Sequence, residues 1–174
     1  MSSSLGADSK HYYEFVIDYL FGMMKNYTEF GLIKAYHLTP RKAYDLFPMA
    51  AAMLTGDRMD DTGHATIQHN AEFTLIVWVQ SFWKENNAEV LYDLSENLKR
   101  LILEHPNFAY TTSGGTAKYP LMRVRPTNVK IEFGTTSYDS RTLDKLEFKF
   151  VATWIENIPT EDTPTTYIRT GPDD

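Results

Sequence analysis

The sequence predicts an α+β fold: a four-stranded, mainly antiparallel sheet with two main helices packed on one face, plus an extended C-terminal arm. Three observations carry this prediction. The segment from Ala65 to Phe82 alternates apolar and polar residues, as a strand covered on one side does. Segments 9–27 and 88–104 repeat apolar residues every three to four positions, as amphipathic helices do. Residues 157–174 hold three prolines and no periodic apolar face.

Length and composition narrow the classes of protein. The 174 residues suit a single domain over residues 1–156, followed by the arm at 157–174. The formal net charge of −6 disfavours a protein that coats DNA or RNA, because phosphate binding needs a concentrated basic face. The absence of cysteine excludes a disulfide scaffold, a thiol nucleophile and a cysteine zinc site.

The N-terminal half begins with a helix. In segment 9–27, further apolar residues flank the main stripe, so more than one face of this helix should be covered. Residues 28–46 are less periodic. The segment Phe47–Leu54 indicates a strand, and Gly56–Gly63 has the glycines and aspartates of a turn. We therefore expect a hairpin with an acidic tip, which is either simply solvated or a contact for a partner.

The second half supplies one helix and the remaining strands. Asn86 or Asn87 caps the helix at 88–104, and the segment Thr111–Thr116 is a glycine-containing loop. Three apolar segments follow, with a break at Pro126 between the first two: Leu121–Arg125, Asn128–Phe133 and the last strand, Leu146–Trp154.

No catalytic motif stands out, and we expect no enzyme, cofactor or metal. His64 and His69 lie near Asp60 and Asp61, but nothing in the spacing makes four ligands converge, so an ordinary strand histidine is the favoured interpretation. Paired carboxylates such as Glu72 and Glu147 need a pocket before they indicate catalysis. Two further features have ordinary interpretations: Gly114-Gly115 lacks the residues of a phosphate loop, and Arg123, Arg125 and Lys130 suit a solvated strand face.

The order of elements resembles that of the tail terminator proteins of long-tailed bacteriophages. The likeness covers roughly residues 9–156. It rests on an N-terminal helix, the small-residue-rich strand Phe47–Leu54, a hairpin, and the long strand Phe73–Gln80 that leads into the helix Ala88–Glu104. The segment 28–46 and the C-terminal arm depart from that pattern.

The resemblance implies a structural virion protein made in the host cytoplasm. It implies a homohexameric ring that caps the tail tube, ends tail polymerisation and joins the tail to the head connector. Its implied partners are its own copies, the tail tube protein and neck or connector proteins, with a tail sheath as a further candidate and no membrane. Genomic DNA would pass through the lumen without specific binding, and the acidic charge of each copy suits this passage.

Candidate partner-contact residues come from three segments: Asp57, Arg58, Asp60 and Asp61 in the acidic tip, Ser113, Gly114 and Gly115 in the loop, and Tyr167 and Arg169 in the arm. Two other classes of protein remain open. One is another head–tail joining, neck or tube-like virion protein. The other is a small α+β enzyme or ligand-binding domain, which a deep pocket holding His69 beside Glu72 or Asp61 would support.

Overall fold

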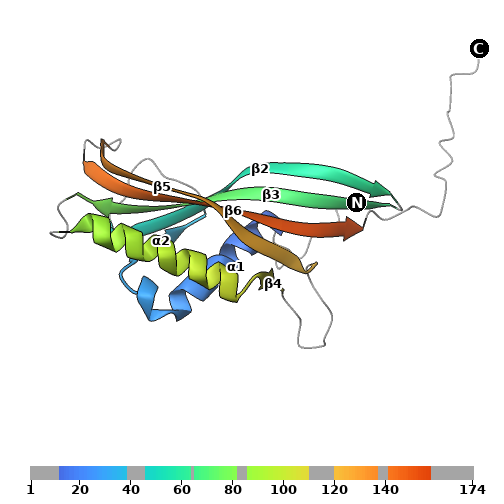
Figure 1. Cartoon of the computed structure of the whole chain (residues 1–174), viewed down its shortest axis with the longest axis horizontal. Coiled ribbons are helices and arrows are strands. Elements are labelled where there is room, and N and C mark those ends of the chain that lie inside the picture. The colour runs from blue at the N-terminus through green and yellow to red at the C-terminus, as the bar shows by residue number, and fades with distance from the viewer. Residues whose placement is uncertain are drawn as a thin grey trace, which may run out of the picture.

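The computed structural model describes residues 12–38, 46–63, 65–81, 86–109, 120–136 and 141–157. These residues form two helices, one 3₁₀ turn and six strands (Figure 1). In chain order the elements are α1 (Tyr12–Asn26), η1 (Thr28–Phe30), β1 (Ala35–His37), β2 (Met49–Gly63), β3 (Thr66–Gln80), α2 (Asn87–Glu104), β4 (Asn107–Phe108), β5 (Met122–Thr136) and β6 (Thr142–Asn157).

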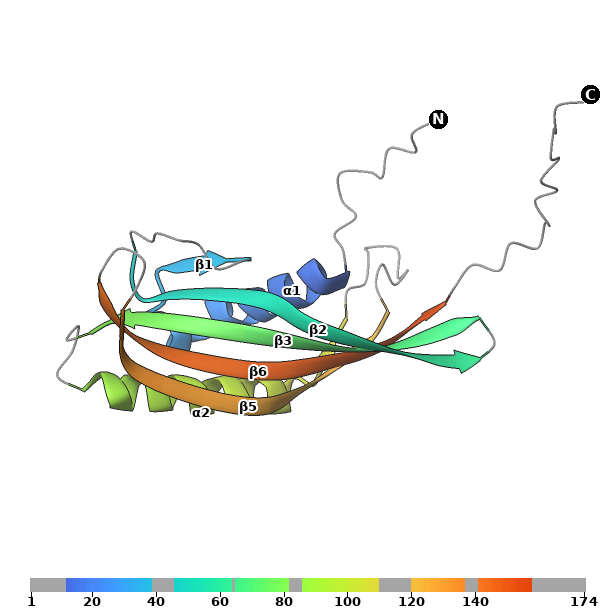
Figure 2. The same ribbon diagram turned by 90° about the horizontal axis from the view of Figure 1, so that it is seen from above.

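The sheet has six strands in the order β1-β2-β3-β6-β5-β4, and it curls around the two helices (Figure 1). The prediction of a four-stranded, mainly antiparallel sheet is therefore wrong. The sheet is mixed, because β1 runs parallel to β2, while every other neighbouring pair is antiparallel. The two strands that sequence analysis missed, β1 and β4, are three and two residues long, too short to show a period. Figure 2 shows β2 and β5 on opposite sides of the central pair β3 and β6.

The predicted turn at Gly56–Gly63 is wrong as well. This segment is the second half of β2, which pairs with β3 as far as Gly63 opposite Thr66. The predicted break at Pro126 is a bulge inside one continuous strand, β5. A second bulge lies between Leu54 and Gly56. A bulge adds a residue to one strand and increases the local twist without ending the strand. β2 and β5 therefore continue past their bulges, paired with the long strands β3 and β6.

The strand at 65–82 and both helices are confirmed. The strand is β3, whose odd-numbered residues from His69 to Val79 face the helices and are buried. The side chain of Asn86 caps α2 by accepting the backbone N–H of Glu89 at 3.1 Å. On the covered face of the sheet, Phe73 stacks on Phe150 with ring centroids 5.3 Å apart, and both rings are fully buried. This core holds α1 and α2 against β2, β3, β5 and β6.

One buried acid ties α2 to the sheet. The carboxylate of Asp144, on β6, accepts hydrogen bonds from Ser81, from Asn87 at the start of α2 and from the backbone N–H of Gly134, all at 2.8–2.9 Å. Burial opposes the charge, but these three hydrogen bonds outweigh it and lower the pKa of Asp144. Gly134 has a positive φ of 67°, which a glycine adopts without strain.

Candidate functional site: a polar network and two open sheet edges

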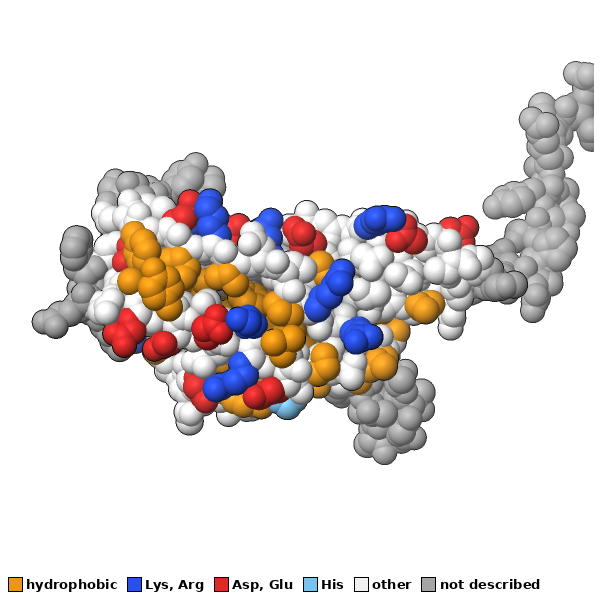
Figure 3. Space-filling model, viewed as in Figure 1, with side chains coloured by type: hydrophobic (Ala, Val, Ile, Leu, Met, Phe, Trp, Pro, Cys, Tyr) orange, Lys and Arg blue, Asp and Glu red, His pale blue; other side chains and the backbone are white. Residues whose placement is uncertain are grey.

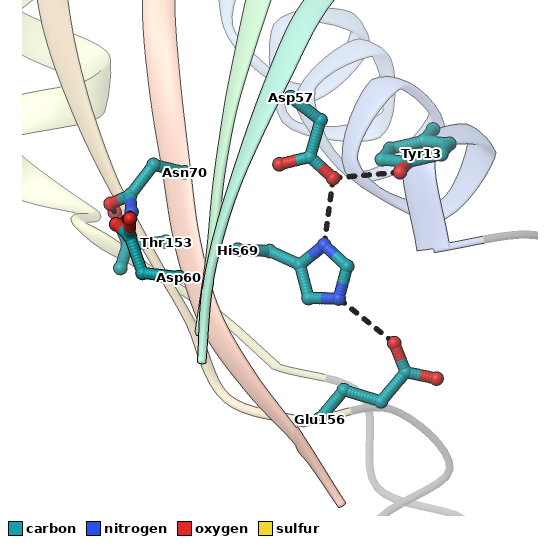
Figure 4. A network of polar contacts seen from close by, with 7 residues as sticks. All are labelled: Tyr13, Asp57, Asp60, His69, Asn70, Thr153 and Glu156. Carbon is teal, nitrogen blue, oxygen red and sulfur yellow. Dashed lines mark hydrogen bonds and ion pairs between the residues drawn. The ribbon is translucent and has the colours of Figure 1, made fainter. Parts of the chain in front are cut away.

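Beyond the helices, the face of the sheet that carries them ends in a polar network (Figure 4). His69, on β3, lies at its centre. Its Nδ1 is 2.7 Å from Oδ2 of Asp57 on β2, and its Nε2 is 2.9 Å from Oε2 of Glu156 on β6. The hydroxyl of Tyr13, on α1, donates to the same Oδ2 of Asp57 at 2.7 Å. The network therefore joins α1 and three strands at one point.

The chemistry of this network favours a structural role for His69. An ionised carboxylate accepts hydrogen bonds and does not donate them, so both contacts form together when both ring nitrogens carry a proton. Neither nitrogen is then left to take a proton from a substrate. The ring also stacks on Trp154 with centroids 4.7 Å apart, and the side chain of His69 is only 7% exposed.

The hydroxyl of Tyr13 lies in the same buried, acidic surroundings as the ring of His69. Burial, together with the hydrogen bond to Asp57 and the negative charge of that carboxylate, raises the pKa of Tyr13 to about 12. Tyr13 also packs edge-on against Trp154, with centroids 5.9 Å apart. The first turn of α1 is thus held to the sheet by apolar packing and by a hydrogen bond to a buried acid.

The outer face of the sheet, on the side away from the helices, has an open groove of about 600 Å³. Three acidic and two basic residues line it: Asp57, Asp60, Glu72, Arg58 and Arg125. The carboxylate of Asp57 is bonded to His69 on the helix side, which leaves two acidic and two basic side chains for the groove. Asp60 also accepts from Asn70 at 3.3 Å, and Thr153 donates to that amide at 3.1 Å (Figure 4). The balance of charges favours neither an anion nor a cation. His69 lies on the other face, so this groove does not hold it beside Glu72.

Both sides of the sheet end in strands that are only partly paired. β1 pairs with β2 only from Met49 to Ala51, and β4 pairs with β5 only at Met122 and Arg123. Within the described ranges, no strand covers the outer edge of β2 beyond that point, nor that of β5 beyond Val124. An edge of this kind presents unpaired backbone N–H and C=O groups that can bind another strand.

The two edges carry opposite charge. β2 has three acidic residues and one basic residue, whereas β5 has three basic residues and one acidic residue. Apolar side chains lie beside them: Met59 on β2 is 58% exposed, and Val129 and Phe133 on β5 are 40% and 50% exposed. Figure 3 shows hydrophobic side chains, in orange, as a band between β5 and α2. Opposite charge beside exposed apolar surface is typical of an interface.

The predicted contact residues divide into two groups. Asp57, Arg58, Asp60 and Asp61 lie on β2 and not in a turn, and the side chain of Asp57 is buried in the network, so it offers no free contact. Ser113, Gly114, Gly115, Tyr167 and Arg169 lie outside the described residues, as do His64 and the arm from 158 to 174. Among the residues that are described, no group of acids and histidines could hold a metal ion.

Sequence analysis missed Asp57 and Glu156 as partners of His69, and Tyr13 as a donor to Asp57. The available signal was a histidine on the apolar face of a strand, since a buried imidazole needs hydrogen-bonding partners. It also missed the open edge of β5, with Val129, Ile131 and Phe133, because strand order decides which strands lie at an edge.

Comparisons with known proteins identify no family. No family model matches the chain, and no curated protein does. One solved structure aligns with 84% of this chain and 94% of its own, at 15% identity and a TM-score of 0.40. A superposition this loose identifies neither a fold family nor an activity. Neither described helix is long and apolar enough to span a bilayer.

Proposed function

We propose that this protein is a structural virion subunit, a tail terminator that forms a ring on the tail tube of a long-tailed phage. The observation that carries the proposal is the pair of open, oppositely charged edges on opposite sides of one sheet. Two different edges that bind each other make a head-to-tail contact, and such a contact closes into a ring when the rotation between copies allows it. The order of elements in the sequence supplies the link to tail terminators.

The network around His69 supports this proposal over the enzyme alternative. The described histidine that lies closest to acidic partners has both ring nitrogens engaged, and the groove near it opens on the other face of the sheet. The polar groups at this end of the sheet thus hold α1, β2, β3 and β6 together. A rigid end is what a subunit needs if it presents an edge strand to a neighbour.

The solution mass, measured by light scattering over a wide range of concentrations, tests the proposal. A ring of six copies of the 20.1 kDa chain would have a mass of about 121 kDa. A discrete species of that mass supports the ring, and electron microscopy of the same sample should show single closed rings. Stacks of rings would favour the alternative of a tube-like virion protein. A monomer at every concentration, also in the presence of tail tubes, would contradict the proposal.

A further inference from the structure

We propose that neighbouring copies join by adding β5 of one copy to β2 of the next, antiparallel and in one register, with Ile131 opposite Met59. This inference rests on the proposed ring and names the residues that build it. It follows from three properties of the two edges: the direction of their backbone groups, the face on which their side chains lie, and the order of their charges.

The hydrogen bonds of the short strands show which backbone groups point outward. At β2, the C=O of Pro48 accepts the N–H of Lys34 at 2.8 Å, so even-numbered residues point out there. The bulge between Leu54 and Gly56 adds one residue, so odd-numbered residues point out in the second half of β2, Met59 among them.

The same argument applies to β5. The N–H of Val124 donates to the C=O of Pro106 at 2.7 Å, so even-numbered residues point out at the start of the strand. The bulge between Pro126 and Asn128 shifts the alternation by one, and Val129 and Ile131 point out beyond it. Odd-numbered residues of both edges therefore carry the free backbone groups.

The side chains of these residues lie on the same face of the sheet. Met59 is the partner of His69, and Ile131 is the partner of Leu146, both of which face the helices. Within one copy β2 and β5 run in opposite directions, because three antiparallel steps separate them. A second copy can therefore add its β2 beside β5, antiparallel, with the helices of both copies on one side.

Charge selects the register. On the outer face, β2 carries Arg58 followed by Asp60, and Nε of Arg58 is 3.1 Å from Oδ1 of Asp60. β5 carries Lys130 followed by Glu132, and Nζ of Lys130 is 2.9 Å from Oε1 of Glu132. In antiparallel strands, Ile131 opposite Met59 places Lys130 opposite Asp60 and Glu132 opposite Arg58. Opposite charges that face each other across a strand pair stabilise it, and like charges destabilise it.

The adjacent registers lack this match. A slip of β5 by one residue would turn its side chains to the opposite face of the sheet, so the nearest alternative registers are slips by two residues in either direction. One such slip places Lys130 opposite Arg58, and the other places Glu132 opposite Asp60, so each brings two like charges together. The selected register also sets the half-exposed Met59 against Ile131 and places it beside the exposed Val129. Charge and apolar burial thus favour the same alignment.

Pairing of two identical edges is the competing arrangement. Two β2 strands could oppose Arg58 to Asp60, but each strand has three acids and one base, so the two strands repel each other overall. Two β5 strands repel in the same way with the opposite sign. Only the mixed pair joins a net negative strand to a net positive one.

Engineered cysteines test the register directly, since the chain has no cysteine of its own. The double variant Met59→Cys/Ile131→Cys places two thiols on directly opposed residues, where Cα atoms about 5.5 Å apart suit a disulfide. Mild oxidation should link most copies into covalent oligomers. Asp61→Cys/Val129→Cys should link as well. The matched control Asp61→Cys/Ile131→Cys, one slip out of register, should link at least about tenfold less.

The single variants Met59→Cys and Ile131→Cys distinguish the mixed β5–β2 pair from the pairing of two identical edges. If β2 met β2 with Met59 opposite itself, Met59→Cys would form a covalent dimer alone, and if β5 met β5 with Ile131 opposite itself, Ile131→Cys would do so. We expect neither to do so. Circular dichroism and thermal melting of each reduced variant should match those of the unmodified chain, as a control for folding.

A charge exchange provides an independent test. The variant Arg58→Asp/Asp60→Arg keeps the composition and the pair within the strand but reverses the order of the charges. It should raise the concentration needed for assembly at least about tenfold. Adding Lys130→Glu/Glu132→Lys should restore much of the assembly. Lys99→Glu/Glu96→Lys, the same exchange on the exposed side of α2, should change nothing.

The outcomes separate the register from the ring. A ring that forms without linkage at positions 59 and 131, or that ignores the charge exchange, overturns the register and leaves the ring standing. Linkage at these positions in chains that remain open supports the register and contradicts the terminator ring. A chain that neither assembles nor links at any concentration contradicts both.

Discussion

The helix-facing side of the sheet is stabilised by different interactions in its two halves. Under the helices, the face is apolar, with Phe73 stacked on Phe150 and both fully buried. Past the first turn of α1, the same strands carry His69, Asp57 and Glu156, and hydrogen bonds to charged groups replace the apolar core. Burial of apolar area stabilises without regard to direction, whereas a charged network requires a defined geometry. The covered half should therefore set the stability, and the outer half should set the shape of the β2 edge.

The largest expected effect comes from breaking the covered half. The variant Phe73→Ala should lower the free energy of unfolding by about 3–5 kcal/mol, because it removes a fully buried ring and leaves a cavity. Urea unfolding followed by circular dichroism measures this loss. Phe133→Ala, at a half-exposed position on β5, should cost less than about 1 kcal/mol. Equal losses in the two variants would show that the covered half does not dominate stability.

Breaking the network should have the next largest effect. His69→Phe keeps a ring that can stack on Trp154 but removes both hydrogen bonds. It leaves the carboxylate of Asp57 buried, with the hydroxyl of Tyr13 still donating to it. We expect a loss of about 2–3 kcal/mol, with faster amide hydrogen exchange confined to the outer half. Adding Asp57→Asn should recover part of the loss. Gln68→Ala, on the other face, is the control.

Asp144 provides a pH-dependent test inside the covered half. Its pKa is lower in the folded chain than in the unfolded one, so its stabilisation is present above the unfolded value and is lost as pH falls through the folded value. Asp144→Asn should cost about 1.5 kcal/mol at neutral pH, and less in acid. Unfolding measured from pH 7 to pH 2 tests this. Asp93→Asn, on the exposed side of α2, should show neither effect.

Tyr13 links the two halves and should give the smallest effect. Tyr13→Phe removes one hydrogen bond to Asp57 and should cost about 1 kcal/mol at neutral pH. Because the pKa of Tyr13 is raised to about 12, its stabilisation is present below about pH 10 and is lost as pH rises towards 12. The variant should lack that alkaline loss, whereas Tyr92→Phe should retain it. A variant as sensitive to alkali as the unmodified chain would contradict this origin.

The local sequence pattern predicted correctly the elements whose apolar residues repeat with a regular spacing. The alternation along β3, the apolar stripe of α2 and its Asn86 cap all lie within short segments, and the structure confirms each of them. The second half of β2 was predicted wrongly because glycine and aspartate are rare in strands. Its pairing with the long β3 overrides that local preference.

The candidate site depends on contacts between distant residues. His69 meets Asp57 from twelve residues away and Glu156 from eighty-seven residues away, so no local pattern could join the three. The open edges depend on strand order, which places β6 between β3 and β5 and leaves β2 and β5 outermost among the long strands. Sequence indicated that the acidic segment around Asp60 could contact a partner, but not that it lies on an open edge strand.

The parallel stacking of Trp154 on His69 makes the network observable by tryptophan fluorescence. The emission of an indole depends on the ring in contact with it, so the fluorescence of Trp154 responds when the imidazole moves away. The chain has two other tryptophans, Trp78 and Trp83, and replacing both by phenylalanine would leave one emitter beside the network. Met59 pairs with His69, and His69 pairs with Trp154, so the buried Trp154 lies two strands in from the β2 edge and its emission would follow the network without an added dye.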